Sequence, residues 1–278
     1  MPLRLPSAIC AALLSSCILS KDVEDPRTDV FVHASSMYVF RGQVMNANGV
    51  AQGAFKTRMP LRGDKEQGLT LQAFGNVDLS DETASSDSEA WFPPGHAGKF
   101  TEVDLSAAYD RKLGPVQFEA ALISYVFPNG TEFPLTAGTF GGERGETKEL
   151  VLRGVWADLR AVQPFLDVHR DFDEVEGWYV AAGLERGVGI TKRLAAELSA
   201  HVGFTDESHA EWVYGIAVDG PADGRLDADF FYELDEFTEL KFGVGFSTLL
   251  QSDLEDWFDT LGIDSTNVWG LVGFAWSI

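Results

Sequence analysis

The feature that most constrains the fold is a repeated alternation of apolar and polar residues with a period of two. Residues 101–110, TEVDLSAAYD, place valine, leucine, alanine and tyrosine on one face and mainly charged or hydroxyl side chains on the other. The same pattern recurs at 194–202, 226–233 and 239–247. Because successive side chains of a β-strand point to opposite faces, these runs predict strands with one apolar and one polar face.

Runs of this kind predict about twelve strands, most of them roughly ten residues long, which is the length that a tilted membrane strand needs. Strands of soluble sandwiches are shorter, nearer about five or six residues. We therefore predict an all-β fold, a transmembrane antiparallel up-and-down β-barrel. A further apolar run at 210–218 is assigned to a loop, because single-chain bacterial barrels favour even strand counts. The predicted strands span 29–42, 51–61, 68–79, 101–112, 115–127, 147–157, 161–170, 177–187, 194–204, 224–234, 239–250 and 267–278.

The predicted connections alternate between two lengths. In outer-membrane barrels the short turns lie in the periplasm and the longer loops outside, so this alternation favours that class. The segment DLEDWFDTLG at 253–262 predicts a short helix with one apolar face, which either folds inward as a constriction or caps the barrel mouth. The short connections are 62–67, 112–115, 157–161 and 187–193, and the long ones are 80–100, 128–146, 205–223 and 251–266.

The N-terminal residues predict export. Arg4 precedes a short apolar run at 8–14, and charge returns at Lys21, which is the pattern of a signal peptide at 1–20. The apolar run is too short to cross a bilayer.

Two cleavage modes fit this leader. The sequence Leu-Ser-Ser-Cys ending at Cys17 resembles a lipobox and predicts a lipidated cysteine, whereas ordinary signal peptidase would cut near Cys17 or Ser20. The only other cysteine is Cys10, so the folded body is expected to hold no disulfide and no thiolate metal site. A short linker at 21–28 and a barrel at 29–278 follow.

The chain is strongly acidic, with a net charge of -22 from 43 Asp and Glu against 21 Lys and Arg. Phosphate groups would be repelled, so no nucleic-acid partner is expected.

The C-terminal residues GFAWSI alternate to the end, with Phe274, Trp276 and Ile278 on one face. Gly273 followed by apolar residues at the third and fifth positions fits the general pattern of a β-signal, although most such signals end in Phe. This predicts that the barrel-assembly machinery recognises the last strand, and that the protein lies in the bacterial outer membrane in contact with its lipid. The alternative is the last strand of a soluble barrel.

If the apolar faces meet lipid, the polar faces line the lumen. Tyr38 and Phe40 are then expected to face lipid near the outer interface, where aromatic residues gather, while Arg41 points inward to carboxylates. Asp78 is also expected inside. The predicted pore-lining residues are Arg41, Lys56, Arg58, Glu102, Asp104, Glu119, Glu149, Arg153, Asp167, His169, Glu185, Glu197, His201, Asp227, Asp229, Glu239 and Lys241.

Carboxylates outnumber cations in this set, so the lumen is predicted to concentrate cations and to pass small polar solutes by diffusion. Two other functions stay open. The lumenal charges could instead form a salt-bridged plug in a structural or docking barrel. A soluble periplasmic lipid-binding barrel would show the same alternation with its faces reversed.

An enzyme is the remaining class, since outer-membrane lipid-modifying enzymes use Ser and His near the lipid rim. The histidines fall on different strands and loops without a lipase motif, and His169 beside Asp167 is the nearest to an orienting pair. We therefore expect no catalytic site and no cofactor. The acidic runs at 78–89 and 171–176 lack EF-hand spacing, so no metal site is assigned, although calcium binding there stays open.

The chain resembles the TorF-type porin family of Gram-negative outer-membrane proteins. The family's Ser-x-Tyr-x-x-Arg-Gly strand end is carried by residues 36–42, SMYVFRG, and its Gln-Gly restart by 51–53, AQG. The spacing before Tyr38 is shorter than usual here, and the proline before AQG is missing. The resemblance covers most of the chain after the leader and implies a barrel that allows diffusion. Further similar segments are FGNVDLSD at 74–81, TEVDLSAAYD at 101–110, ISYVFPNG at 123–130 and DFDEVEGWYV at 171–180.

Overall fold

The computed structural model describes residues 26–61, 64–81, 95–129, 146–159 and 161–278 of the chain. The predicted signal peptide at 1–20, with Cys17, lies outside the described residues, as does most of the acidic run at 78–89.

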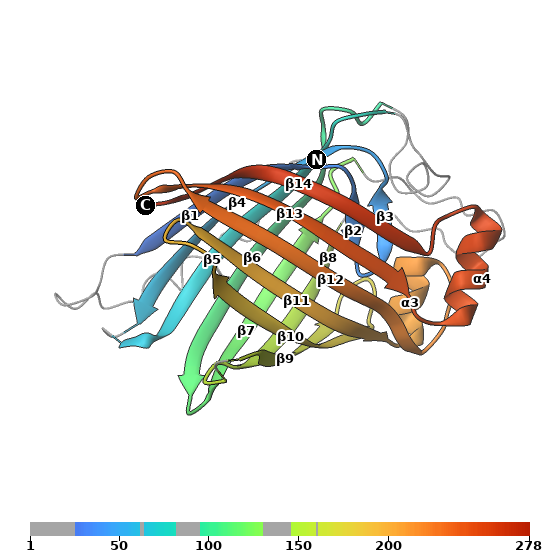
Figure 1. Cartoon of the computed structure of the whole chain (residues 1–278). Coiled ribbons are helices and arrows are strands. Elements are labelled where there is room, and N and C mark those ends of the chain that lie inside the picture. The colour runs from blue at the N-terminus through green and yellow to red at the C-terminus, as the bar shows by residue number, and fades with distance from the viewer. Residues whose placement is uncertain (1–25, 62–63, 82–94, 130–145, 160) are drawn as a thin grey trace, which may run out of the picture.

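Twelve antiparallel strands in the described residues close into a barrel, and this confirms the predicted fold class (Figure 1). Each strand pairs with the barrel strands before and after it, and β1 pairs with β14 to close the ring. The barrel strands are β1 (Arg27–Ser35), β4 (Val50–Leu61), β5 (Asp64–Asp78), β6 (Phe100–Leu113), β7 (Val116–Val126), β8 (Glu146–Trp156), β9 (Gln163–Asp171), β10 (Trp178–Gly189), β11 (Leu194–Thr205), β12 (Gly220–Glu233), β13 (Thr238–Leu249) and β14 (Thr266–Ser277).

The first predicted strand, 29–42, is wrong at its C-terminal end. The barrel strand β1 stops at Ser35, and the chain then folds into a separate hairpin of β2 (Tyr38–Phe40) and β3 (Gln43–Asn46). The turn consists of Arg41 and Gly42, whose φ angles are 48° and 82°. Two central residues with positive φ are the requirement of a type I′ hairpin turn, so the chain reverses where the alternation predicted that it would continue.

The two faces of the barrel have opposite chemistry. Large apolar side chains are exposed on the outer face, as the alternation predicted, while charged and small residues point inward. A soluble lipid carrier would need the reverse arrangement, so the observed faces are those of a membrane barrel. The outward apolar residues include Val32, Phe55, Leu71, Leu105, Leu122, Leu150, Leu166, Leu184, Leu198, Leu226, Val244, Val268 and Val272.

The two ends of the barrel also differ (Figure 1). At one end, which we call the short-turn end, Thr28 and Ile278 exchange backbone hydrogen bonds of 3.0 and 2.8 Å. At the other, the long-loop end, lie two helices, α3 (Glu207–Tyr214) and α4 (Ser252–Leu261). The predicted helix at 253–262 is therefore confirmed, and it caps the mouth. The run at 210–218 was correctly kept out of the barrel, but its first part is helix α3.

Local sequence explains both helices. Asp206 caps the first turn of α3 by accepting a hydrogen bond from the backbone N–H of His209, and Gly215 ends it with a positive φ. Gly262 ends α4 in the same left-handed conformation. Their apolar faces pack on each other and on the barrel rim, around Tyr214 and Phe258. Within the described ranges, no helix has the length and apolar character to cross a membrane.

Candidate functional site: the barrel lumen

Strand pairing gives the position of every predicted pore-lining residue. Inner-face rows run across neighbouring strands, for example Glu119, Arg153 and Asp167, or Ser199 and Asp227. Continuing these rows around the ring places the barrel-strand members of the predicted set on the inner face, together with Asp78. That they line an open pore stays a prediction, because the β2–β3 hairpin occupies part of the lumen.

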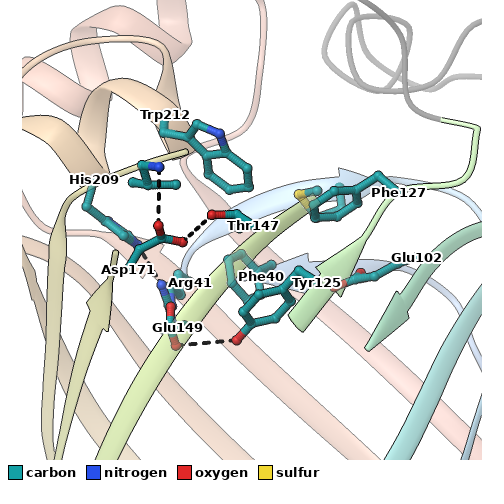
Figure 2. Close-up of a pocket in the computed structure, with 12 residues that line it drawn as sticks. Phe40, Arg41, Glu102, Tyr125, Phe127, Thr147, Glu149, Asp171, His209 and Trp212 are labelled. Atoms are coloured by element: carbon teal, nitrogen blue, oxygen red, sulfur yellow. Dashed lines mark hydrogen bonds and ion pairs between the residues drawn. The ribbon is translucent and has the colours of Figure 1, made fainter. Parts of the chain in front are cut away.

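One side of the hairpin packs on the wall formed by β6–β8 (Figure 2). Phe40 meets the ring of Tyr125 edge to face, and both join Met45 and Phe127 in an apolar cluster. The Tyr38 hydroxyl donates a 2.6 Å hydrogen bond to Glu102 Oε2. The expectation that Tyr38 and Phe40 face lipid is therefore wrong, because the turn directs both of them into the lumen.

Very little space remains on this side of the hairpin. The cavity between the hairpin and the wall has a volume of about 20 Å³, with Trp212 of α3 at its rim (Figure 2). A space of that size holds about one water molecule. On the other side, Val39 and Val44 pack on Trp269 of β14. The hairpin is therefore packed on both sides against the barrel wall at the long-loop end.

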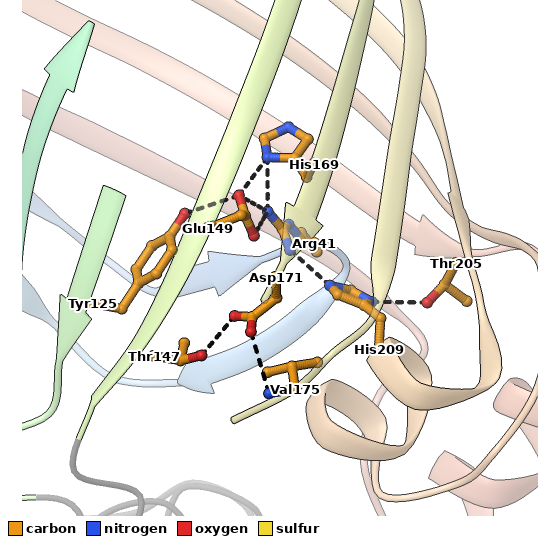
Figure 3. Close-up of polar contacts among 9 residues, drawn as sticks. All are labelled: Arg41, Tyr125, Thr147, Glu149, His169, Asp171, Val175, Thr205 and His209. Atoms are coloured by element: carbon orange, nitrogen blue, oxygen red, sulfur yellow. Dashed lines mark hydrogen bonds and ion pairs between the residues drawn. The ribbon is translucent and has the colours of Figure 1, made fainter. Parts of the chain in front are cut away.

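The tip of the hairpin is held by Arg41 (Figure 3). Its Nη2 lies 2.8 Å from both carboxylate oxygens of Glu149, and its guanidinium lies over the ring of Tyr179 at 4.5 Å. The arginine side chain is only 9% exposed and that of Glu149 only 3%. The prediction that Arg41 pairs with an inward carboxylate is confirmed. Burial alone would lower the pKa of Arg41, but the charge of Glu149, the neighbouring Tyr125 and Tyr179 and the hydrogen bond to Glu149 together outweigh burial and raise that pKa.

Two histidines complete this cluster. Arg41 Nη1 donates to His209 Nε2 at 2.6 Å, so Nδ1 of His209 carries the proton and donates to the Thr205 hydroxyl at 2.7 Å. Burial and the neighbouring Arg41 charge lower the pKa of His209 well below its ordinary value. His169 Nδ1 lies 2.5 Å from Glu149 Oε1. The candidate orienting pair of His169 with Asp167 does not form, because His169 lies against Glu149 while Asp167 accepts from Arg153.

Helices α3 and α4 hold the hairpin turn from outside. The Tyr214 hydroxyl of α3 donates a 2.6 Å hydrogen bond to the backbone carbonyl of Arg41, and the indole of Trp257 in α4 donates to the Tyr214 carbonyl at 2.9 Å. Gly42 lies against Asp223 of β12, where an added Cβ would come within 2.7 Å of the Asp223 Cβ. The hairpin thus reaches from β1 and β4 to the opposite wall of the ring, β8 to β12.

The lumen beyond the hairpin is hollow. A central cavity of about 650 Å³ lies between the hairpin and the short-turn end, and a second cavity of about 430 Å³ lies nearer that end. Both are lined by Glu185, Ser199, Asp227 and Asp229, so they adjoin. The two cavities form one polar space that occupies the inner half of the barrel.

Charges in this space are mostly paired across strands. Arg153 reaches both Asp167 and Glu185, at 2.6 and 2.5 Å. Lys241 of β13 pairs with Asp229 of β12, and Arg225 pairs with Asp227 within β12, each at 2.8 Å. The central cavity is therefore nearly balanced in charge.

The mouth cavity at the short-turn end is lined by the four carboxylates Glu185, Glu197, Asp227 and Asp229 and by Arg186. Three of these carboxylates are the partners of Arg153, Arg225 and Lys241 described above, so Glu197 is the carboxylate that this cavity adds to the ion pairs. Two members of the predicted acidic set, Glu102 and Glu149, do not contribute to this space, because the hairpin buries them to 3% and 2% exposure.

Sequence reasoning missed several residues of the site. Tyr179 and Arg225 occupy inner-face positions within predicted strands, and Asp223 lies one residue before the predicted strand 224–234, so following the alternation to the end of each strand would have found them. His209 could not be found that way, because it belongs to a helix that was taken for loop.

The acidic run at 171–176 has a structural role. Asp171 accepts hydrogen bonds from the Thr147 hydroxyl and from the backbone N–H of Asp173 and Val175, and Asp173 pairs with Lys148. In the part of the chain that the structure describes, no three His, Cys, Asp or Glu side chains gather as a metal site would require.

Comparison with known proteins places the fold. No protein-family model matches the sequence, and no curated protein sequence matches it. Among solved structures, an outer membrane channel from Pseudomonas putida F1 is similar, with 11% identity over 91% of this chain and 94% of that chain and a TM-score of 0.53. The KdgM porin has 10% identity over 90% and 99%, with a TM-score of 0.47, and Salmonella typhi OmpF in complex with daunomycin has 8% over 94% and 99%, with a TM-score of 0.41. At such identities the likeness concerns the fold, and the chain has the barrel fold of an outer-membrane channel.

Proposed function

We propose that this protein is a porin-like channel of the bacterial outer membrane that lets small polar solutes diffuse and prefers cations. The observation that carries the proposal is the hollow, polar inner half of the barrel, where two adjoining cavities are lined by charged side chains. A barrel of this size can hold either water or packed side chains. Here the structure has water-accessible space over one half of the lumen and packed side chains over the other.

The preference for cations is supported by the mouth cavity. Glu197 lies there beside the ion-paired carboxylates Glu185, Asp227 and Asp229, and an excess of one sign of charge in a cleft attracts counter-ions. The selectivity is thus expected to arise at the short-turn end, from Glu185, Glu197, Asp227 and Asp229.

The packed hairpin favours a second candidate, a non-conducting barrel with a structural or docking role. Arg41, Tyr38 and Phe40 hold the hairpin inside the long-loop end through a buried ion pair, a hydrogen bond and an aromatic contact. If the hairpin closes this end permanently, the inner cavities form a closed-ended vestibule. Ion conduction separates the two candidates.

The test is reconstitution in a planar bilayer under a KCl gradient. The proposal expects single-channel currents whose reversal potential shows K⁺ preferred over Cl⁻. Selectivity should weaken at high salt, because the Debye length falls from about 10 Å at 0.1 M to about 3 Å at 1 M. Insertion without any current would support the non-conducting barrel, and preference for Cl⁻ would contradict the assigned field.

A double variant tests whether the lumenal carboxylates set the ion selectivity. Asp227→Asn with Asp229→Asn removes two carboxylates and leaves Arg225 and Lys241 without their partners, so the reversal potential should move towards anions. Asp158→Asn, at an exposed turn outside the lumen, is the matched control and should leave the reversal potential unchanged. An equal shift in both variants would show that the lumenal carboxylates do not set selectivity.

The location and partners belong to the same proposal. The exposed apolar outer face supports contact with outer-membrane lipid, and the alternating last strand supports recognition by the barrel-assembly machinery. Recovery of the protein in the soluble periplasm, with no heat-modifiable gel band, would contradict this location. Membership of the TorF-type porin family is likewise proposed, on the motif at 36–42, which here forms the hairpin.

We propose no catalytic activity. The histidines of the lumen contact residues of the hairpin or the wall: His209 bonds Arg41 and Thr205, His169 lies against Glu149, His33 against Gln52, and His201 lies 3.7 Å from Asp223. A phospholipid hydrolysis assay on the refolded barrel tests this directly, and turnover above a heat-denatured control would contradict it.

A further inference from the structure

The two sides of the β2–β3 hairpin are held in different ways. On the side of β6–β8, the hairpin makes a buried ion pair through Arg41, a hydrogen bond through Tyr38 and an aromatic contact through Phe40. The cavity left on this side has a volume of about 20 Å³. A solute could pass here only if several directional contacts broke together.

The side that faces β14 is held by apolar packing. Val39 and Val44 of the hairpin lie against the indole of Trp269, whose residue is 6% exposed. At the base of the hairpin, Ser36 and Gly270 exchange hydrogen bonds of 2.9 and 3.1 Å, which tie the start of β2 to β14. Contacts between aliphatic side chains and an indole lack the directional bonds that hold the other side, so the indole is the part of this contact that can move.

Trp269 lies between the hairpin and the central cavity. The cavity of about 650 Å³ is lined by Trp269, Val39 and Gly245, so its hollow space reaches this side of the hairpin. The indole covers Gly245 of β13 so closely that an added Cβ would overlap its ring atoms. The guanidinium of Arg225 lies 4.9 Å from the indole centre and helps to hold it there. The indole is therefore held over a glycine, beside a space into which it can turn.

The inner-face row beyond the indole, toward the long-loop end, is polar. Ser247 of β13 pairs with Asn267 of β14, one row beyond the pair of Gly245 and Trp269. Asn267 Nδ2 donates to the backbone carbonyl of Asp264, an exposed residue of the loop before β14. Ser247 Oγ is fully buried and has no hydrogen-bond partner among the described residues. A buried hydroxyl without a partner costs free energy that a water molecule would remove, so entry of water is favoured here.

From this arrangement we infer that solutes pass the hairpin along β13 and β14, and that Trp269 is the residue that sets the limiting width of the channel. The inference rests on the proposed channel function and names its constriction. The indole closes this route by covering Gly245. When the indole turns into the central cavity, that cavity joins the polar row of Ser247 and Asn267. An apolar constriction excludes ions by losing its water, so the indole limits ions as well as larger solutes.

Single-channel recordings of the purified protein in KCl test the constriction. Trp269→Ala should raise the conductance several-fold, and Trp269→Phe should give a value between those of the wild type and Trp269→Ala. Phe127→Ala is the matched control, because it removes an aromatic ring from the apolar cluster on the other side of the hairpin and should leave the conductance unchanged. An unchanged conductance in Trp269→Ala, or an equal rise in Phe127→Ala, would overturn the inference.

Thiol labelling distinguishes an opened route from a hairpin that is merely loosened. In the Trp269→Ala background, Ser247→Cys places a thiol on the proposed route, and Thr147→Cys replaces a buried hydroxyl on the other side of the hairpin. A charged methanethiosulfonate reagent should reduce the current of Ser247→Cys and leave that of Thr147→Cys unchanged. Trp269→Ala without an added thiol controls for Cys10 and Cys17. Equal reduction at both positions, or reduction at neither, would contradict a route along β13 and β14.

The outcomes separate this inference from the channel function. Heat-modifiable gel mobility shows whether each variant is folded, and Trp269→Phe carries the test if Trp269→Ala does not fold. Wild-type current that neither substitution changes would overturn the route alone. Current in a Trp269 variant without any wild-type current would contradict the channel function of the native protein and support the route. Insertion without current in all of them would overturn both.

Discussion

The two halves of the lumen are built from the same strands but have opposite interiors. At the long-loop end the β2–β3 hairpin, α3 and α4 leave a cavity of only about 20 Å³ beside Arg41. At the short-turn end the lumen holds cavities of about 650 and 430 Å³. Since the inner faces of both halves carry charged residues, wall composition does not explain the difference. The difference comes from a segment of fewer than fifteen residues that folds inward between β1 and β4.

This comparison teaches where conduction is decided. The charges of the wall can select among ions only where water reaches them, and in the packed half Glu102 and Glu149 are bound to hairpin residues instead. The short-turn half is expected to set selectivity, and the hairpin half is expected to set how much current passes. The following changes test that division of roles, beginning with the largest expected effect.

Removing the hairpin should have the largest effect. Ser35 and Val50 are paired neighbours in β1 and β4, so residues 36–49 can be replaced by about four Gly and Ser residues without stretching the chain. Single-channel conductance should rise several-fold, with the preference for K⁺ retained because the mouth carboxylates are untouched. Unchanged conductance in a correctly folded variant would show that the hairpin is not the narrowest part.

Arg41→Met should have the next largest effect. Removing one partner of a buried ion pair leaves the other charge, Glu149, uncompensated and costs about 3–5 kcal/mol. The hairpin should no longer be held against the wall, so the conductance should rise and the thermal unfolding temperature should fall. The matched control is Arg58→Met, whose pair with Asp110 lies in the open half and is one-third exposed on the arginine side. Such exposed pairs contribute about 0–1 kcal/mol, so equal effects of the two variants would contradict the comparison.

Gly42→Ala should have a smaller effect of the same kind. An alanine at this positive φ is strained by about 1–2 kcal/mol, and its Cβ would also press against Asp223. Gly114→Ala carries the strain without the contact, since no heavy atom lies within 4 Å of its added Cβ. Conductance should rise only for Gly42→Ala. A similar rise in conductance in both variants would show that backbone strain causes the effect, and not the loss of the contact between the hairpin and Asp223.

Acidification should have the smallest effect. The pKa of His209 is lowered while the hairpin is packed against the wall. With the hairpin detached, His209 would therefore bind a proton more readily below about pH 6.5. Packing of the hairpin should weaken as the pH falls through that value. With the hairpin packed in place, the groups around His209 are Arg41, Glu149, His169, Tyr179 and Thr205. One group contributes at most about 1.4 kcal/mol per pH unit. The gain in conductance between pH 7 and pH 5 should be reduced in His209→Gln, and an identical gain would exclude His209 as its source.

Sequence reasoning was accurate where the structure repeats. The alternation in β6, β11, β12 and β13 identified both faces of each strand, because a strand with lipid on one side and water on the other must alternate. The helix α4 was also predictable, since the apolar residues of 253–262 recur with helical spacing. The inner-face assignments of Arg153, Asp167 and Glu185 follow from the same rule.

Sequence reasoning was inaccurate where the local pattern and the tertiary contacts disagree. Residues 36–42 continue the alternation of β1, so Tyr38 and Phe40 read as lipid-facing. Only the contacts with Glu149, His209 and Tyr214 reveal that the chain turns inward at Arg41, and these partners lie 108, 168 and 173 residues away in sequence. The pairing of His169 with Glu149 was missed for a related reason. The alternation within one strand does not tell which residues of the neighbouring strand lie beside it.

The sequence by itself determined the strands of the barrel: their approximate number and length, which residues share a face, and which connections are long. These properties depend on neighbours one or two positions apart, which the chain order specifies. The tertiary structure alone decided how much of the lumen is filled. Whether a polar inner face meets water, a buried arginine or an aromatic ring depends on which distant segment packs against it, and that is settled by side-chain fit across the width of the barrel.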